Sequence, residues 1–339
     1  MNEQQMKKKL LIPIFAAILV SVAAAVTFYC ADKLLSYALS PVPPEAAEDS
    51  PLYVPAEAPS GEDGGTEEAA EASEGQDAQA LSDEAYRWLK SAAAVESITS
   101  SDGVRLNAYF VENKRRGSRK YAVVMHGYRS APRSVAIYAR HFYEQGFHVL
   151  VPGQRGHGWS GGRCIDMGAL SKYDAASWIV HLSRKDTDAE ILLHGVSMGA
   201  ATVMLATGLA LPANVRCAIE DCGYDTLYRE FAFRMAEEFH LPAFPILNAA
   251  SLLCRQKFGF FFGEVSPLYA VARSSVPTLF IHGTADTYVP FFMLGELYGA
   301  AAAPKEKHAV EGAEHGRSVY TAPEAYWNAV DSFAARYFD

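Results

Sequence analysis

The chain has 339 residues, half of them hydrophobic, and a formal net charge of −9. This length exceeds the needs of one average domain. The negative charge lies in residues 41–80, so residues 81–339 are neutral overall and show no basic patch that would favour nucleic-acid binding. The five cysteines form no C-x-x-C pair and no cluster with histidine at metal-binding spacing, and we expect them to be unpaired thiols.

An uncharged apolar segment begins at Leu10. Its first twenty residues, 10–29, span about 30 Å as a helix, which is the thickness of the hydrocarbon core of a bilayer. Three lysines at positions 7–9 precede it, and positive flanks stay in the cytoplasm. The sequence therefore predicts a cell-membrane protein with a cytoplasmic N-terminus at 1–9, one transmembrane helix at 10–31 and an extracytoplasmic remainder.

A cleaved signal peptide is the alternative interpretation of this segment. The apolar core of a signal peptide usually has about 7–15 residues, which is shorter than the segment found here. Ala23, Ala24 and Ala25 offer a site for cleavage. The length of the apolar segment favours the uncleaved anchor.

An acidic segment follows. Residues 41–80 contain eleven acidic residues, six prolines and no lysine or arginine. Such a segment buries too little apolar surface to offset its chain entropy, and its like charges repel one another. We predict a disordered stalk over 32–80 that holds a domain away from the membrane. The alternative is an acidic tail that binds a partner.

Residues 81–339 alternate between strand-like and helix-like patterns. The predicted helices run from Ser134, as a cap, to Gln145, and over Lys172–Ser183 and Tyr326–Tyr337. The predicted strands are Val95–Thr99, Val104–Val111, Tyr121–Met125, Phe147–Val151, Glu190–Val196, Val215–Glu220, Thr278–Ile281 and Lys307–Val310.

This alternation predicts an α/β fold, with a mostly parallel eight-stranded sheet and helices on both faces. Ligands of such sheets bind at the carboxyl ends of the strands. The phenylalanine-rich interval at about 225–265 interrupts the alternation and predicts a small helical lid. Its rings either pack the lid onto the domain or form a pocket wall for an apolar acyl chain.

The motif G-V-S-M-G at 195–199 lies between a strand-like and a helix-like run. A serine at the tip of a sharp strand–turn–helix is the nucleophile elbow of serine hydrolases. Gly195 and Gly199 fit this interpretation because the strained turn brings the strand and the helix close together.

The chain from about 95 to 337 resembles the α/β-hydrolase superfamily of serine hydrolases, and most closely its bacterial single-pass membrane-anchored members. The resemblance rests on five motifs in the order of the superfamily: H-G-Y at 126–128, R-G-H-G-W-S at 155–160, G-V-S-M-G at 195–199, H-G-T-A-D at 282–286 and G-A-E-H-G at 312–316.

The resemblance implies a catalytic triad, with Ser197 as nucleophile, His315 as base and Asp286 as the acid that orients the base. Asp221 at the end of the preceding strand is the rival for the acid. The backbone N–H groups of Met198 and Tyr128 are expected to form the oxyanion hole.

The sequence departs from the superfamily in the loop before R-G-H-G. That loop usually carries an aspartate after the proline of the strand, whereas this chain has Gly153 and Gln154 after Pro152. The departure puts the hydrogen bonding of the loop in question. A serine nucleophile, in place of an aspartate, argues against dehalogenase and epoxide-hydrolase chemistry.

These features predict a serine hydrolase that cleaves a carboxylic ester, carboxylesterase- or lipase-like, through an acyl-enzyme. The expected partners are a small-molecule ester or acyl substrate with an apolar acyl part, and the membrane. No metal or organic cofactor is implied, because protein groups supply all the machinery of acyl transfer. The alternatives are a peptidase, thioesterase or acyltransferase of the same fold, or a non-catalytic, membrane-tethered binding module.

Overall fold

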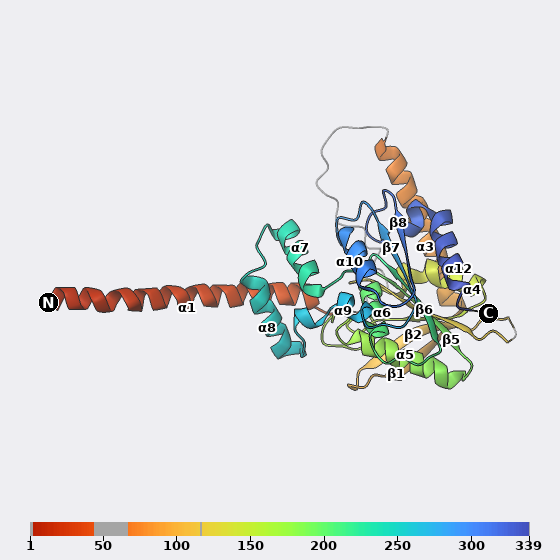
Figure 1. The fold of residues 1–339 in the computed structure, drawn as a ribbon, viewed down its shortest axis with the longest axis horizontal. Helices are drawn as coiled ribbons and strands as arrows, with labels where there is room; N and C mark the ends of the chain where they lie inside the picture. The colour runs from red at the N-terminus through yellow and green to blue at the C-terminus, as the bar shows by residue number, and fades with distance from the viewer. Residues whose placement is uncertain (1–2, 44–66, 116, 339) are drawn as a thin grey trace.

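A computed structural model describes residues 3–43, 67–115 and 117–338. Its centre is one eight-stranded sheet with the strand order β1-β2-β4-β3-β5-β6-β7-β8 (Figure 1). The β1–β2 and β2–β4 pairs are antiparallel, and all later pairs are parallel, which confirms the predicted sheet. The strands are β1 Ala94–Thr99, β2 Arg105–Val111, β3 Lys120–Met125, β4 His148–Pro152, β5 Glu190–Val196, β6 Val215–Asp221, β7 Thr278–Gly283 and β8 Lys305–Val310.

Helices cover both faces of the sheet because the central strands are apolar on both sides. Along β3, Ala122 and Val124 belong to one buried cluster, with α3, α4 and α12, whereas Val123 and Met125 belong to another, with α5 and α6. The helices are α1 Glu3–Leu39, α3 Glu67–Ala92, η1 Pro132–Val135, α4 Ala136–Glu144, α5 Ser171–Lys185, α6 Met198–Thr207, α7 Leu227–Phe239, α8 Ile246–Phe258, η2 Phe262–Glu264, α9 Pro267–Val271, α10 Phe292–Ala300, α11 Ser318–Thr321 and α12 Pro323–Ala334.

One predicted helix start needs correction. Ser134 does not cap α4, which begins at Ala136. Pro132 instead begins the short 3₁₀ turn η1, and the Ser134 hydroxyl donates to the carbonyl of Ala131 inside that turn. The fixed φ of proline favours a helical first turn and moves the start of helical structure ahead of the serine.

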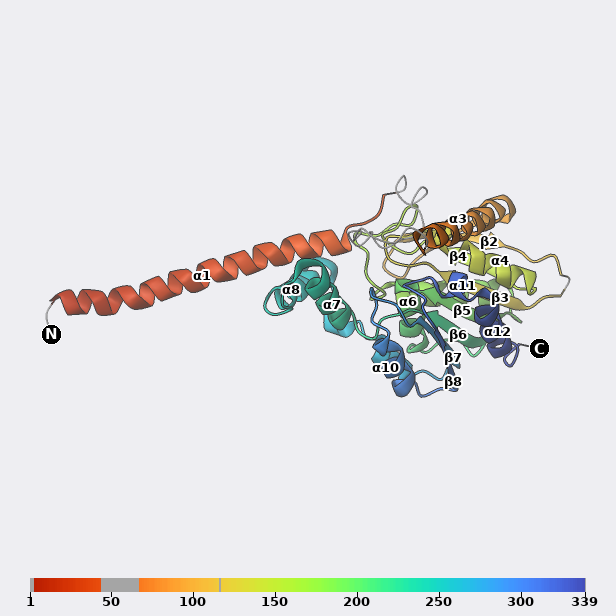
Figure 2. The same ribbon diagram turned by 90° about the horizontal axis from the view of Figure 1, so that it is seen from above.

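Helix α1 is one continuous helix that extends away from the domain (Figures 1 and 2). Within the described residues, it is the helix long and apolar enough to cross a membrane, over Ala17–Leu39 with a mean hydropathy of 1.7. Only 11% of its most apolar window is buried, unlike the core helix of a soluble protein. Apolar side chains such as Ile18, Leu19 and Val20 are exposed.

The structure corrects both boundaries of the predicted stalk. Residues 32–39 continue α1, because Leu35 and Leu39 are buried in one apolar cluster with α8. At the other end, α3 begins at Glu67, and its residues Ala85 and Leu89 pack into the core beside α4. The middle of the predicted stalk, residues 44–66, lies outside the described residues.

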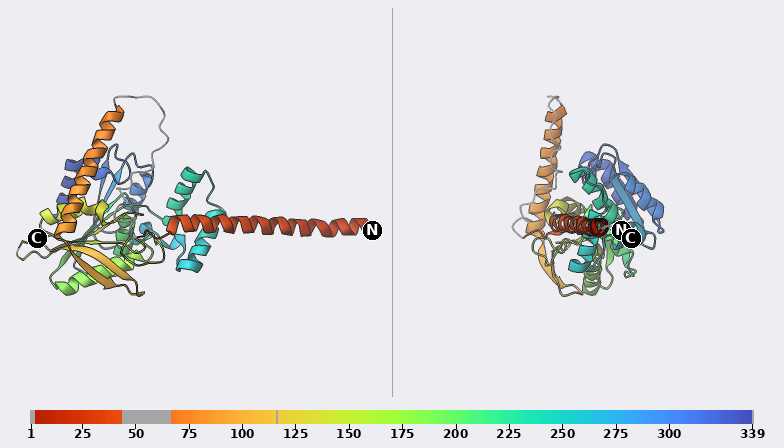
Figure 3. Two further views of the ribbon diagram at one scale, coloured as in Figure 1. Left: turned by 180° about the vertical axis from the view of Figure 1, so that it is seen from behind. Right: turned by 90° about the vertical axis from the view of Figure 1, so that its left-hand side faces the viewer.

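The predicted lid is helical. Helices α7 and α8 and the turn η2 lie between β6 and β7, and α7 and α8 lie beside the last turns of α1 (Figures 1 and 3). Tyr37 of α1 contacts Phe239 of α7 edge-on, with ring centroids 6.2 Å apart. The lid therefore connects the N-terminal helix to the carboxyl edge of the sheet.

Candidate active site

Ser197 forms the turn between β5 and α6, with φ 57° and ψ −120°. A positive φ is unusual for a residue with a side chain and must be held by its surroundings. The Ser197 N–H donates to the Asp221 carbonyl at 2.8 Å, and the Ala201 N–H donates to the Ser197 carbonyl at 3.0 Å. A Cβ on Gly199 would lie 2.2 Å from the Met125 carbonyl oxygen, so glycine is required there.

A chain of two hydrogen bonds joins Ser197, His315 and Asp286. The Oγ of Ser197 lies 2.8 Å from Nε2 of His315, and Nδ1 of His315 lies 2.7 Å from Oδ2 of Asp286. The three residues follow β5, β8 and β7 respectively. The structure thus brings together the three residues proposed from the sequence, at the carboxyl edge of the parallel sheet.

The surroundings of Asp286 favour its anionic form. Its Oδ1 accepts hydrogen bonds from the backbone N–H groups of Tyr288 and Val289, each at 2.9 Å. Burial raises the pKa of this carboxyl, but His315 and the contact with His282 outweigh burial and hold the pKa below its usual range. A carboxylate in this position can accept a hydrogen bond from the Nδ1–H of His315 and stabilise the imidazolium.

Asp221, the rival carboxylate, has a different environment. It ends β6, its side chain is completely buried, and burial raises its pKa to about 6. The His315 ring nitrogen that faces a carboxylate is bonded to Asp286. Asp221 contributes its backbone carbonyl, which holds the amide of Ser197 in place.

The segment after β3 lies against Ser197, and its Tyr128 lines the same cavity as lid helix α7. A Cβ on Gly127 would lie 3.5 Å from the Cβ of Ser197, which brings the Gly127–Tyr128 backbone beside the serine. Met198 is the first residue of α6, so its N–H lies in the first turn, where a helix leaves its amides available for an anion.

The side chain of Tyr128 binds the N-terminal helix, which sequence reasoning missed. Its hydroxyl donates to the carbonyl of Ala38 at 2.7 Å. The neighbouring Arg129 donates to the carbonyl of Tyr37 and stacks over the Tyr37 ring. The backbone of Val42 is bonded to the loop after β4, through Gly156. The end of α1 is therefore part of the site.

Gln154 makes several hydrogen bonds in the loop after β4, where the superfamily usually carries an aspartate. Its side-chain amide donates to the carbonyl of His126, and its Oε1 accepts from the hydroxyl of Thr202 at 3.0 Å. Its backbone N–H donates to Nε2 of His126 at 3.0 Å. Burial lowers the pKa of His126 to about 3, which leaves the ring neutral and able to accept this bond.

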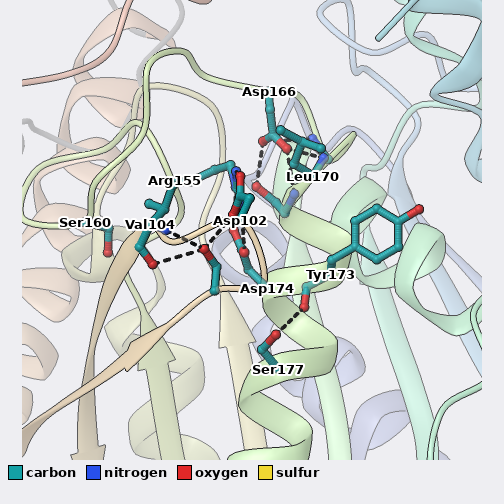
Figure 4. A network of polar contacts seen from close by, with 12 residues as sticks. Asp102, Val104, Arg155, Ser160, Asp166, Leu170, Tyr173, Asp174 and Ser177 are labelled. Atoms are coloured by element: carbon teal, nitrogen blue, oxygen red, sulfur yellow. Dashed lines mark hydrogen bonds and ion pairs between the residues drawn. The ribbon is translucent and has the colours of Figure 1, made fainter. Parts of the chain in front are cut away.

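An ion network fixes the rest of this loop (Figure 4). The buried guanidinium of Arg155 donates twice to Asp174 at the start of α5, at 2.6 Å each, and reaches Asp102 in the β1–β2 turn at 2.8 Å. Asp166 accepts from the backbone N–H and hydroxyl of Ser171, both at 2.6 Å. These bonds hold the loop that carries Gly156 against α1.

Two cavities meet at Ser197. The first has a volume of about 140 Å³, and its walls are mostly apolar and come from α1, the lid and the loops after the strands. The second has a volume of about 60 Å³; its walls are also mostly apolar, with polar groups that include Ser130, His315 and Arg317. A substrate bound at Ser197 can place one part in each cavity.

Glu230 of α7 lines the first cavity, and sequence reasoning missed it too. The residue is 3% exposed, and neither carboxyl oxygen has a hydrogen-bond partner among the described residues. Burial raises the pKa of this carboxyl well above its usual value. In the sequence, Glu230 is one acidic residue of an amphipathic helix, and such residues usually face solvent.

The cysteines carry free thiols. The sulfur of Cys222 lies within 4.8 Å of ligand atoms of Asp286 and His315, a grouping that can hold a metal ion. Asp286 and His315 are already bonded to each other, and His315 to Ser197. Burial also raises the pKa of the Cys222 thiol, which disfavours the thiolate that metals bind.

Comparisons with known proteins agree with this architecture. Residues 117–220 match the family described as serine aminopeptidase, S33. The chain is 30% identical over 212 residues to the uncharacterized protein YqkD of Bacillus subtilis, covering 62% of this chain and 70% of YqkD. It is 26% identical to the uncharacterized protein YfhR of Escherichia coli strain K12, covering 66% and 74% of the two chains.

Solved structures of esterases and peptidases share the fold. The esterase Pf2001 of Pyrococcus furiosus superposes with a TM-score of 0.60 at 23% identity, covering 73% of this chain and 92% of the esterase. An acylaminoacyl peptidase of Pyrococcus horikoshii gives a TM-score of 0.56 at 16% identity, covering 73% and 42%. From the relatives, the family match and the shared fold, we conclude that this chain belongs to the α/β-hydrolase superfamily.

Proposed function

We propose that this hydrolase is a serine esterase that cleaves a carboxylic ester through an acyl-enzyme. The observation that carries the proposal is the hydrogen-bond chain from Ser197 through His315 to Asp286 beside a mostly apolar cavity. A serine hydroxyl needs a neighbouring base to attack a carbonyl, and this arrangement supplies the base and a group that orients it.

In the proposed reaction, Oγ of Ser197 attacks the ester carbonyl carbon while Nε2 of His315 takes the hydroxyl proton. Asp286 stabilises the resulting imidazolium, and the N–H groups of Met198 and Tyr128 hold the oxyanion. The C–O bond of the ester then breaks, and the leaving alcohol takes the proton from His315. Water, activated by His315, hydrolyses the acyl-enzyme and releases the acid.

The two cavities support an ester with an apolar acyl part. The acyl chain fits the wall formed by residues such as Met235, Leu247 and Phe262. The alcohol fits the smaller cavity, beside Ser130 and Arg317. This assignment gives the phenylalanine-rich lid a role in binding as well as in packing.

A peptidase is the second candidate. It is favoured by the description of the matching family as a serine aminopeptidase and by the acylaminoacyl peptidase among the similar structures. The same hydrogen-bond chain cleaves amides in enzymes of other folds, so the bond preference depends on the cavities. Faster turnover of an aminoacyl arylamide than of the matched ester would favour the peptidase.

The proposed location is the outer side of the cell membrane, with α1 as the anchor. The three lysines at 7–9 support a cytoplasmic N-terminus, and the exposed apolar surface of α1 supports insertion. A protease added to intact cells should then remove the domain that contains Ser197. A domain that is digested only after lysis would contradict this orientation.

The experiment that tests the enzyme proposal is fluorophosphonate labelling of the full chain in detergent micelles, with Ser197→Ala as the control. The full chain is needed because α1 and α3 pack on the domain. We expect labelling and ester turnover in the wild type and neither in the variant. Equal labelling of both, or turnover of no ester by a folded wild type, would contradict the proposal.

A further inference from the structure

The N-terminal helix forms part of the wall of the cavity that reaches Ser197. Leu34 and Ala38 line this cavity, and Leu35 between them is buried against the lid. The carbonyl groups at the end of the helix are satisfied by the domain: Ala38 by the hydroxyl of Tyr128 and Leu39 by the N–H of Ile165. The helix is therefore rigidly joined to the substrate cavity.

The position of the cavity along α1 sets its depth relative to a bilayer. Residues 10–31 carry no charge and span about 33 Å as a helix, enough for a hydrocarbon core. The first charged residues after this span are Asp32 and Lys33, which we place at the polar surface of the membrane. Asp32 pairs with Lys257 of α8. The cavity wall begins at Leu34, about 5 Å further along the helix. This depth is that of the lipid headgroups.

The lid has an exposed apolar surface beside α1. Phe244 is 73% exposed, and Phe239, Leu241 and Leu252 are about half exposed. The connection between α7 and α8, which carries Leu241 and Phe244, lies on the side from which α1 leaves the domain (Figures 1 and 3). Apolar surface grouped in this way marks an interface with a protein or a membrane. The direction of α1 favours the membrane.

We infer that the lid, residues 227–258, rests in the headgroup region of the bilayer beside α1, and that the substrate is an acyl lipid of the same membrane. The inference rests on the proposed esterase function. The acyl chain passes from the bilayer between α1 and α7 into the apolar cavity, and the ester carbonyl reaches Ser197. The products are the free fatty acid and the lyso-lipid or alcohol.

The test uses the full chain in vesicles of phosphatidylethanolamine and phosphatidylglycerol that contain a fluorogenic acyl lipid. Turnover of this lipid is compared with turnover of p-nitrophenyl butyrate, a soluble ester. The lid variant is Leu241→Ser with Phe244→Ser. The control is Tyr173→Ser, an exposed aromatic residue on α5.

The lid variant should lose lipid turnover by about tenfold, because it removes apolar surface from the membrane contact. Its turnover of the soluble ester should stay unchanged, and the control should keep both activities. Equal lipid turnover by the lid variant and the wild type would overturn the inference. A wild type that cleaves the soluble ester but no membrane lipid would also overturn it, and would leave the esterase proposal standing.

Absence of both activities together with absence of fluorophosphonate labelling would overturn the esterase proposal and this inference with it. A measurement independent of turnover uses Phe244→Trp in the inactive Ser197→Ala chain. Lipids brominated near the headgroup end of the acyl chain should quench the added tryptophan fluorescence if residue 244 lies in the headgroup region. No quenching beyond that of the four native tryptophans would overturn the membrane contact.

Discussion

Asp221 ends β6 and Asp286 follows the neighbouring strand β7, but their surroundings shift the pKa of the two carboxyls in opposite directions. Asp286 is held as an anion by its histidine neighbours, whereas burial raises the pKa of Asp221 to about 6. Asp286→Asn should lower kcat by about 10⁴-fold, because the imidazole loses the partner that fixes its tautomer. Asp221→Asn should retain most of the activity. Ester turnover of the two variants side by side checks this, and the reverse order would make Asp221 the acid.

Glu230 should make stability depend on pH. Its pKa in the folded chain is raised above the usual 4.5, so the folded state binds the proton more tightly than the unfolded state. Below about pH 4.5 the carboxyl is protonated in both states and does not lower the free energy of unfolding. As the pH rises from there towards the folded pKa, the free energy of unfolding falls by about 1.4 kcal/mol per pH unit.

The variant Glu230→Gln carries no charge at any pH. Denaturant unfolding at pH 5 and pH 8 should show a smaller loss of the free energy of unfolding in the variant than in the wild type. Parallel losses in the two proteins would mean that the Glu230 carboxyl is solvated or paired in solution.

The sequence was sufficient to predict that Ser197, His315 and Asp286 lie close together. Each lies in a short motif after a strand, and the fold brings the carboxyl ends of its parallel strands to one edge of the sheet. It was insufficient for Glu230 and for the Tyr128 hydroxyl. Their environments depend on which helices pack over them, and no local pattern encodes that packing. The hydrogen bonds of Gln154 could not be predicted either, since its partners His126 and Thr202 come from other elements.

The elbow between β5 and α6 depends on a close approach of backbones at Gly199. Gly199→Ala places a methyl group against the carbonyl of Met125 and should lower the free energy of unfolding by about 1–3 kcal/mol. It should also lower turnover by about 10²-fold, since a shift of about 1 Å moves Ser197 out of line with His315.

Gly295 of α10 is the matched control for this substitution. Nothing lies within 4 Å of a Cβ at that position, and the residue is exposed on the helix. Gly295→Ala should raise the free energy of unfolding by up to about 1 kcal/mol and leave turnover unchanged. Thermal unfolding and ester turnover of the two variants check both statements, and a fully active Gly199→Ala would contradict the first.

Strands were predicted to within two residues at each end because their apolar runs are bounded by turn residues. Helix ends were less predictable. Local composition suggested that the chain leaves α1 near residue 31, yet contacts of Leu35 and Leu39 with the lid extend the helix by eight residues. The charged residues Asp32 and Lys33 suggested that the helix ends there, but tertiary packing continues it.

In chain order, the molecule consists of an apolar helix, an acidic segment and an α/β domain. The composition of the sequence alone indicated this order. Deletion of residues 1–43 should lower Tm and expose apolar surface to a dye, because it uncovers the side of the lid against which Leu35 and Leu39 are buried. Each of these side chains contributes about 1.5–3 kcal/mol.

Deletion of residues 1–28 is the control, since it keeps Ala31, Leu35 and Leu39, which are buried against the domain. Its Tm should equal that of the full chain. A deletion of residues 1–43 with an unchanged Tm would show that the last turns of α1 do not stabilise the domain in solution.

The end of α1 contacts residues that are synthesised much later, so these contacts can form only late in translation. Tyr128 lies 90 residues after Ala38, and Lys257 lies 225 residues after Asp32. Translation at about 5–20 residues per second makes the end of α1 roughly ten to fifty seconds before α8. Leu35 and Leu39 therefore wait without their partners during synthesis, and the substrate cavity cannot close before its last wall residue, Val289, has been made.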